Sequence, residues 1–281
     1  MSRYRHEIDN ARAHVVSLWL KRNPLGPDSG ELLARLLRRN RRIHTLDLVN
    51  TGLLDDGARP VIEALADNES LEHLYLGTNG LGPRSAEALA DVLRSTSRLR
   101  SLFVSCNRLA DEGVAHLASA LRDNRGLERL GLASNRLGPA AAKALAEALA
   151  EHDGLRFLDL GWTRATAAVG ELGNRIGNEG AMALADMLRT NRTLQALDVS
   201  HNRISQSGID AIAEALDGNE QLVFLRHPQH GKAVNHDSLA GLHERLEHNW
   251  ARSSERDPQL RRDDIMTPRA TQEILSVYRT A

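Results

Sequence analysis

Histidines near the end of the chain form the group whose side chains could most directly bind a metal ion. Five of the 12 histidines fall between residues 227 and 248: His227, His230, His236, His243 and His248. Neutral imidazole is a common metal ligand, so His227-x-x-His230 with His243 could supply three nitrogens. Metal signatures nevertheless place their ligands at fixed spacing on a defined helix or loop, which this segment lacks. We therefore predict no metal and no other cofactor, and interpret Leu239, Leu242 and Leu246 as the apolar stripe of a capping helix.

Cys106 is the only cysteine and hence the only candidate thiol nucleophile. It occupies a slot after a predicted strand that Asn50, Thr78 and Ser134 fill in other repeats, which indicates a structural position. The chain has no Gly-rich phosphate loop, no H-E-x-x-H segment and no nucleophile elbow. These observations predict a protein that is not an enzyme, and the lone cysteine fits a reducing cytoplasm.

A leucine pattern, L-x-x-L-x-L-x-x-N-x-L, must position any functional side chains. Its central leucine recurs every 28 residues, except for one interval of 39: Leu18, Leu46, Leu74, Leu102, Leu130, Leu158, Leu197 and Leu225. A fixed period of this kind is the signature of stacked repeats, each too small to bury its apolar side alone. In the unit 127–154, alternation around Leu130 and Leu132 predicts a short strand, and Leu145 and Leu149 predict the inner face of a helix.

Asparagines mark two turns of each repeat. One set follows the strands, where a buried carboxamide can satisfy turn N–H and C=O groups: Asn23, Asn79, Asn107, Asn135, Asn174 and Asn202. Thr51 replaces this asparagine in the second repeat, where we predict a local defect. The other set ends helices, and we expect it to adopt the left-handed backbone that asparagine tolerates: Asn40, Asn68, Asn124, Asn191 and Asn219.

On these motifs the chain resembles leucine-rich repeats of the ribonuclease-inhibitor type, over roughly residues 15 to 228. The segment Glu179 to Ala185, E-G-A-M-A-L-A, is also similar to the GALA-type repeats of bacterial effector proteins. The predicted fold is α/β: a right-handed solenoid, in the form of a partial horseshoe, with a concave parallel β-sheet and convex α-helices. We predict an N-terminal cap (1–14), eight repeats (15–228), a capping helix (229–250) and a charged tail (251–281).

Aromatic residues are concentrated at positions that flank the core leucines and should point outward from the concave face. Five of the nine aromatics occupy such positions: Trp19, Tyr75, Phe103, Phe157 and Phe224. A sixth, Trp162, lies just beyond a strand. Charged residues at outward positions complete the predicted partner-binding site: Asp47, Asp159, Asp198 and Arg226. Aromatic anchors are typical of binding hot spots, at about 2 kcal/mol or more each. The alternative is that these rings stack along the sheet or are covered by the terminal segment.

The interval of 39 residues places an insertion, Thr163 to Gly173, in the sixth repeat. Insertions in repeat proteins map to loops, often on the binding side, and Arg164 and Glu171 are the only charged candidates in this one. A tolerated loop without a role is the alternative, because loop lengthening costs little free energy.

The tail after Asn249 is charged and interrupted by proline, and it cannot bury enough apolar surface to fold alone. Its apolar groups are Ile265-Met266 and a segment that predicts a short helix from Pro268 to Tyr278. Candidate recognition residues in that segment are Ile274, Val277, Tyr278 and Arg279. Three interpretations remain open: a peptide recognised by a partner or modifying enzyme, an intramolecular clasp on the solenoid, and disorder.

Composition limits the classes of partner. A formal net charge of −1 gives no global attraction to nucleic acid or to an acidic membrane, and no apolar run could span a bilayer. The basic run from Arg35 to Arg42 fits a solvated convex face, with a local acidic-partner or nucleic-acid patch as the alternative. Only three of the 36 basic residues are lysine, which is typical of a GC-rich bacterial genome. We expect a soluble, cytoplasmic protein whose partner is a protein or peptide.

The predicted function is that of a protein-interaction scaffold, an inhibitor or adaptor, that binds its partner on the concave face. One alternative is a carrier that presents its C-terminal tail to a modifying enzyme. The other is a GTPase-activating protein, which a likeness to the repeats of Ran GTPase-activating proteins implies, with Arg22 or Arg164 as the candidate that aids hydrolysis.

Overall fold

The computed structural model describes residues 16–162, 164–168, 170–227, 236–257, 261 and 265, with residues 164–165 and 236–238 described by their backbone alone. Within this part of the chain one eight-stranded sheet has the order β1 to β8, and every neighbouring pair is parallel. Its strands are β1 (Ser17–Trp19), β2 (Thr45–Asp47), β3 (His73–Tyr75), β4 (Ser101–Phe103), β5 (Arg129–Gly131), β6 (Phe157–Asp159), β7 (Ala196–Asp198) and β8 (Phe224–Arg226).

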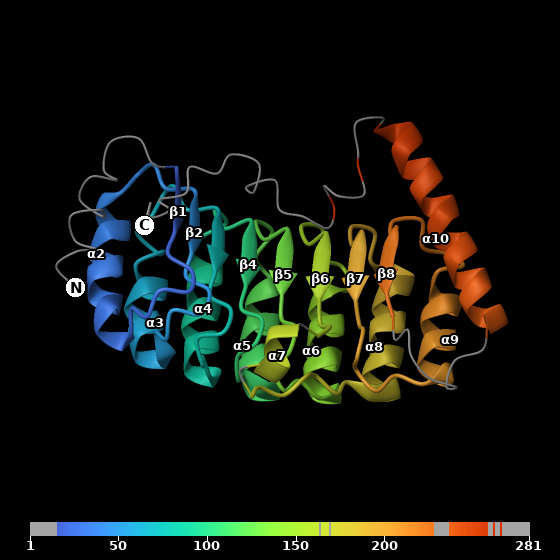
Figure 1. Ribbon diagram of the computed structural model, residues 1–281. Helices are drawn as coiled ribbons and strands as arrows, with labels where there is room; N and C mark the ends of the chain where they lie inside the picture. The colour runs from blue at the N-terminus through green and yellow to red at the C-terminus, as the bar shows by residue number, and fades with distance from the viewer. Residues whose placement is uncertain are drawn as a thin grey trace, which may run out of the picture.

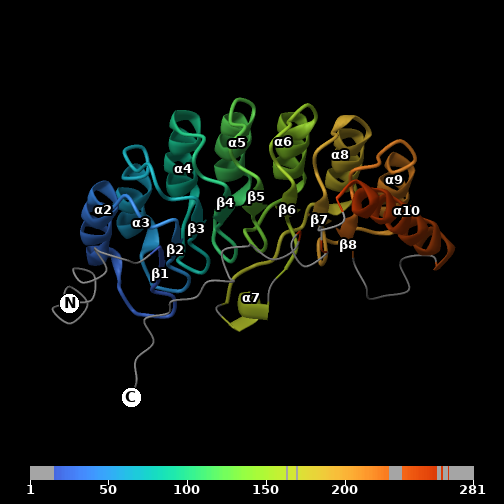
Figure 2. The same cartoon turned by 90° about the horizontal axis from the view of Figure 1, so that it is seen from above.

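Helices follow the strands and form a second layer on one side of the sheet (Figure 1). The helices of this layer are η1 (Pro27–Ser29), α2 (Gly30–Arg39), α3 (Leu54–Glu63), α4 (Pro83–Ser95), α5 (Ala110–Leu121), α6 (Pro139–Leu149), α8 (Gly177–Thr190) and α9 (Gln206–Ala215). Two more helices lie outside it: α7 (Arg164–Ala168) and α10 (His236–Arg256). Figure 2 shows α2 to α6, α8 and α9 along the outer arc and the strands along the inner one, with α7 apart from this row of helices. Helices pack about 8–10 Å apart and strands about 4.8 Å apart, so the layer of helices must take the longer arc. The predicted α/β solenoid with a concave parallel sheet is confirmed.

The repeat leucines set the register and fill the core. Each central leucine pairs with the next, and Leu158 pairs with Leu197 despite the longer interval. Leu46, Leu74 and Leu102 are fully buried between the two layers. The main core of the described residues contains aliphatic side chains and Met187 but no aromatic ring, so the aromatics must lie elsewhere.

The strand-end asparagines form a buried ladder between repeats. The Nδ2 atom of Asn107 donates hydrogen bonds to the carbonyl oxygens of Leu76 (3.1 Å) and Val104 (2.8 Å), and its Oδ1 accepts from the N–H of Asn79 (2.9 Å). The predicted defect at Thr51 is wrong. Thr51 Oγ1 donates to the Leu48 carbonyl (2.8 Å), and Asn79 of the next repeat donates to the same oxygen (2.8 Å).

A second asparagine ladder lies at the helix ends, and here the predicted left-handed backbone is wrong. Asn40 has φ −94° and ψ 130°, and Asn191 has φ −64° and ψ 135°, which are extended conformations. Their side chains, not their backbones, explain the residue type. Asn191 Nδ2 donates to the carbonyls of Leu149 (2.7 Å) and His152 (3.1 Å) in the preceding repeat. His152 takes the same slot one repeat earlier, with its Nε2 2.7 Å from the Asn124 carbonyl oxygen.

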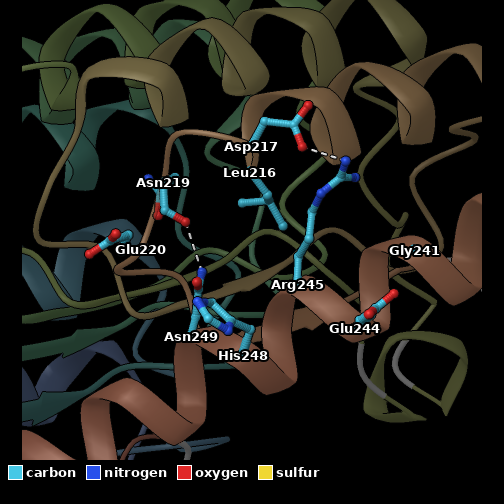
Figure 3. A pocket seen from close by; sticks show the side chains of 9 residues that line it. All are labelled: Leu216, Asp217, Asn219, Glu220, Gly241, Glu244, Arg245, His248 and Asn249. Atoms are coloured by element: carbon cyan, nitrogen blue, oxygen red, sulfur yellow. Dashed lines mark hydrogen bonds and ion pairs between the residues drawn. The ribbon is translucent and has the colours of Figure 1, made fainter.

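Helix α10 lies against the last repeat and runs to Arg256, six residues beyond the predicted end at 250. Leu242 and Leu246 are buried in the core. Asn249 extends the second ladder by donating to the carbonyls of Asn219 (2.8 Å) and Leu222 (2.9 Å). Figure 3 shows the hollow between α10 and the turn after α9, whose charged and polar lining includes the Arg245–Asp217 ion pair. We regard this hollow as the polar seam of the cap, since its side chains already bond one another across it.

Candidate interaction surfaces

Three aromatic side chains from β3, β4 and β6 form a continuous row on the concave face. Tyr75 and Phe103 are stacked with ring centroids 5.3 Å apart, and Phe103 lies 6.0 Å from Phe157. Gly131 of β5 makes this possible, because a Cβ atom there would lie 2.3 Å from Cδ1 of Phe103. Phe103 therefore leans across β5 toward β6. We call Tyr75, Phe103 and Phe157 the aromatic row.

Arg129 of β5 contacts the aromatic row. The only feature of the sequence that pointed to Arg129 was its outward position on a predicted strand. Its guanidinium carbon lies 4.6 Å from the centroid of the Phe157 ring, a cation–π arrangement. Burial lowers the pKa of Arg129 and raises the pKa of Tyr75 to about 12, so the phenol stays protonated at neutral pH. The Tyr75 hydroxyl is buried and has no hydrogen-bond partner within the described part of the chain.

Ile265 covers the end of the aromatic row. It belongs to a small apolar cluster with Phe157, Ala196 and Val223, which Phe103, Phe224 and Trp250 partly enclose. Phe157 is consequently only 5% exposed, so the prediction that its side chain faces solvent is wrong. The physical reason is that an aliphatic side chain from outside the repeats removes this ring from water. The sequence left open the alternative that a residue of the terminal segment covers the outward rings, and at Phe157 this alternative is correct.

The remaining outward aromatics are half-buried, and two of them lie beside a cation two residues further along the chain. Lys21 Nζ lies 4.6 Å from a ring centroid of Trp19, and the guanidinium of Arg226 lies 5.8 Å from that of Phe224. Trp162 stands beyond β6, where its ring lies 5.1 Å from His201 of the next repeat. Trp162 is therefore separate from the aromatic row and lies at the rim.

Carboxylates of the concave face are more buried than predicted. Asp47 and Asp198 are 6% and 4% exposed, so their predicted exposure to solvent is wrong. Close strand spacing on the inner arc crowds these side chains, and each accepts a hydrogen bond from an N–H two residues onward. Lys21 lies 3.9 Å from Asp47, and Arg226 lies 3.0 Å from Asp198. The negative charges of these two aspartates, which were predicted to belong to the partner-binding site, are thus partly neutralised by cations of the same chain.

Asp159 is the most perturbed acid of the face. It neighbours Asp198 in strand register and accepts a hydrogen bond from the N–H of Gly161 (2.9 Å). Burial first, and the Asp198 charge second, raise the pKa of Asp159 to about 7. Asp159 therefore titrates near neutral pH.

The insertion folds back over the rim instead of projecting from it. Glu171 Oε1 lies 2.7 Å from Arg108 Nε and its Oε2 lies 2.9 Å from Arg136 Nη2, while the glutamate side chain is 5% exposed. Thr166 Oγ1 donates to Ser134 Oγ at 2.6 Å and lies 3.5 Å from Cys106 Sγ. Cys106 is therefore buried beneath the insertion. Arg164 begins α7, and its side chain lies outside the described residues, whereas Arg22 is exposed after β1.

Two histidines from the C-terminal group meet at the cap. The Nε2 atoms of His227 and His243 are 3.4 Å apart, whereas His230 lies outside the described residues. Among the described residues no group of three or more His, Cys, Asp or Glu side chains could hold a metal ion. The predicted tail residues also lie outside the described part of the chain: Ile274, Val277, Tyr278 and Arg279.

Comparison with known proteins supports the repeat assignment. A family model described as leucine-rich repeat matches residues 67–90, 98–118, 173–185 and 190–213. No curated protein matches the chain. No described helix is long and apolar enough to cross a membrane.

Two solved structures are similar in outline. One is leiomodin-1 actin-binding site 2, at 19% identity and a TM-score of 0.49, covering 60% of this chain and 92% of that one. The other is the tropomodulin C-terminal domain of Caenorhabditis elegans, at 14% identity and a TM-score of 0.33, covering 90% of this chain and 96% of that one. At these values the likeness carries no inference about what this chain binds.

Proposed function

We propose that this chain is a non-enzymatic protein-interaction scaffold, an inhibitor or adaptor, that binds an apolar segment of a partner protein on its concave face. Repeat length and the strand-helix unit favour the ribonuclease-inhibitor type of leucine-rich repeat. The observation that carries the proposal is the packing of the Ile265 side chain against Phe157, Ala196 and Val223. An aliphatic side chain from outside the repeats already finds a binding surface on this face.

The chemistry of the face defines the kind of segment that fits. Burying an aliphatic side chain contributes about 2–3 kcal/mol, and the aromatic row offers ring faces beside the Ile265 contact. Lys21, Arg129 and Arg226 lie near ring faces or carboxylates of the same surface, so polar groups flank the apolar strip. A partner segment with aliphatic residues would pack along Tyr75 and Phe103 and compete with Ile265 at Phe157.

Affinity capture from the native cell tests this proposal. The variant Tyr75→Ser/Phe103→Ser should lose the captured partner, and purified partner should bind it at least about tenfold more weakly. Met182→Ser is the matched control, because Met182 is 46% exposed on helix α8 of the convex layer. Circular dichroism and thermal unfolding establish that each variant is folded. Unchanged capture by a folded concave-face variant would refute the proposal.

No observation among the described residues specifically favours the carrier or the GTPase-activator alternative. The tail residues 274–279 and the side chain of Arg164 lie outside them. Deletion of residues 266–281 distinguishes a carrier, since a carrier loses its modifying enzyme while a concave-face scaffold keeps its partner.

A further inference from the structure

Four successive repeats carry an arginine at the same rim position, directly after the strand-end asparagine. These exposed residues, which we call the arginine column, are Arg108, Arg136, Arg175 and Arg203. They lie outside the concave face, so an inference drawn from them is independent of the proposed function.

The first two members of the arginine column hold a carboxylate. Glu171 bridges Arg108 (2.7 Å) and Arg136 (2.9 Å), and its side chain is only 5% exposed. Two guanidinium groups around one carboxylate form charge-assisted hydrogen bonds, which are among the strongest in proteins. The chain itself thus shows what kind of group fits between neighbouring members of the column.

The second two members repeat the backbone of the first two. The N–H of Arg108 donates to the Leu81 carbonyl at 2.7 Å, and the N–H of Arg175 donates to the equivalent Leu137 carbonyl at 2.7 Å. Arg136 and Arg203 have φ values of 64° and 58°. Because the backbones are equivalent, the side chains of Arg175 and Arg203 leave the main chain at positions equivalent to those of Arg108 and Arg136.

The surroundings of the second pair favour an anion more than those of the first. Asp111 accepts a hydrogen bond from Gly138, close to Arg136, whereas its equivalent Asn178 accepts from Ser205, close to Arg203. A carboxylate is therefore replaced by a neutral amide. Among the described residues neither Arg175 nor Arg203 forms an ion pair with an acidic side chain, and both are exposed.

Apolar groups adjoin the second pair. Trp162 and His201 occupy neighbouring repeats with rings 5.1 Å apart, and a Cβ atom at Gly173 would lie 3.3 Å from Trp162 Cδ1. Leu172, next to Gly173, is 50% exposed. The rim thus combines two arginines with apolar surface.

We propose that Arg175 and Arg203 bind the carboxylate of an acidic residue in a partner protein, as Arg108 and Arg136 bind Glu171. The partner segment carries an apolar residue beside the acidic one, which contacts Trp162 and Leu172. This rim site would act as a second point of attachment beside the concave face.

A peptide copied from the chain's own insertion is the probe. The acetylated, amidated peptide A-A-V-G-E-L-G, residues 167–173, presents Glu171 next to Leu172. It is titrated into the intact, ¹⁵N-labelled protein at low ionic strength while the arginine side-chain resonances are followed by NMR. The matched peptide has glutamine in place of glutamate.

The expected result is saturable shifts of the Arg175 and Arg203 resonances with the glutamate peptide and none with the glutamine peptide. Arg203→Gln should weaken binding about tenfold, and added salt should weaken it further. Arg156→Gln is the control, because it removes the same charge from an exposed residue at the other end of a strand. Equal binding of both peptides, or no effect of Arg203→Gln, overturns the proposal. If Asp263→Asn/Asp264→Asn alone shifts the two arginine resonances, the chain's own tail is the occupant, which also overturns it.

Discussion

Replacing Asp159 by asparagine should stabilise the protein at neutral and alkaline pH. The half-buried side chain lies beside Asp198 and accepts a hydrogen bond from the N–H of Gly161, a bond that an asparagine Oδ1 can also accept. Asparagine resembles the protonated acid in shape and has no charge to bury. Asp159→Asn therefore removes the cost of ionising a carboxyl group in this place and keeps its hydrogen bond.

The magnitude follows from the pKa of Asp159, which rises from its ordinary value of 3.8 to about 7 in the folded chain. The folded state binds the proton more tightly than the unfolded state does, so stability is greatest at low pH for this group. It falls as the pH rises from about 4 and levels off above about 7. At about 1.4 kcal/mol per tenfold change in proton affinity, the full effect is about 4 kcal/mol. About 2 to 3 kcal/mol of it should appear between pH 5 and pH 8.

Urea unfolding of both proteins at several pH values from 5 to 8 measures this effect. His73 and His152, whose pKa values burial lowers, are common to both proteins, so the difference between the two curves isolates Asp159. Asp91→Asn is the control, because it removes an exposed carboxylate that pairs with Arg94. A difference that does not change with pH, or an equal one for Asp91→Asn, would refute the reasoning.

Three further substitutions test the packing of the repeats. Asn135→Ala removes one of the two asparagine donors at the buried carbonyls of Val104 and Leu132, and the side-chain acceptor of the Leu109 N–H. It should cost about 1–3 kcal/mol by chemical denaturation, against less than about 0.5 kcal/mol for the exposed Ser119→Ala. Gly131→Ala should cost about 1–3 kcal/mol because its Cβ meets the Phe103 ring, and the cost should vanish in a Phe103→Ala background; an additive double-mutant cycle would contradict this. Leu54 has a φ of 54°, so Leu54→Gly should be about 1 kcal/mol more stable than Leu54→Ala in thermal unfolding, and equal stabilities would argue against backbone strain there.

Asparagine roles show how far a local pattern can be interpreted. The strand-end asparagines were predicted as a buried ladder, and Asn107 forms one with Leu76, Val104 and Asn79. The helix-end asparagines were predicted from backbone preference, whereas Asn191 acts through its side chain. Residue type alone does not distinguish these two uses, because the same amide can serve a left-handed turn or a neighbouring repeat.

Spacing in the sequence determined the strands, the solenoid and the place of the insertion. It could do so because each repeat packs on the next, so a contact recurs with the period of 28 residues and leaves a pattern in the leucines. Outward positions followed from the alternation of side chains along each strand. The sequence alone therefore predicts which residue types occupy these positions, including the three rings of the aromatic row.

Tertiary structure alone decided which of those outward side chains meet water. Ile265 covers Phe157 from a segment that has no repeat, and Glu171 joins Arg108 and Arg136 from an insertion that occurs once. Contacts made by unrepeated segments leave no period in the sequence. The leucine pattern thus determined the solenoid. The arguments for the concave face and for the rim both depend on where single, unrepeated residues, Ile265 and Glu171, contact that solenoid.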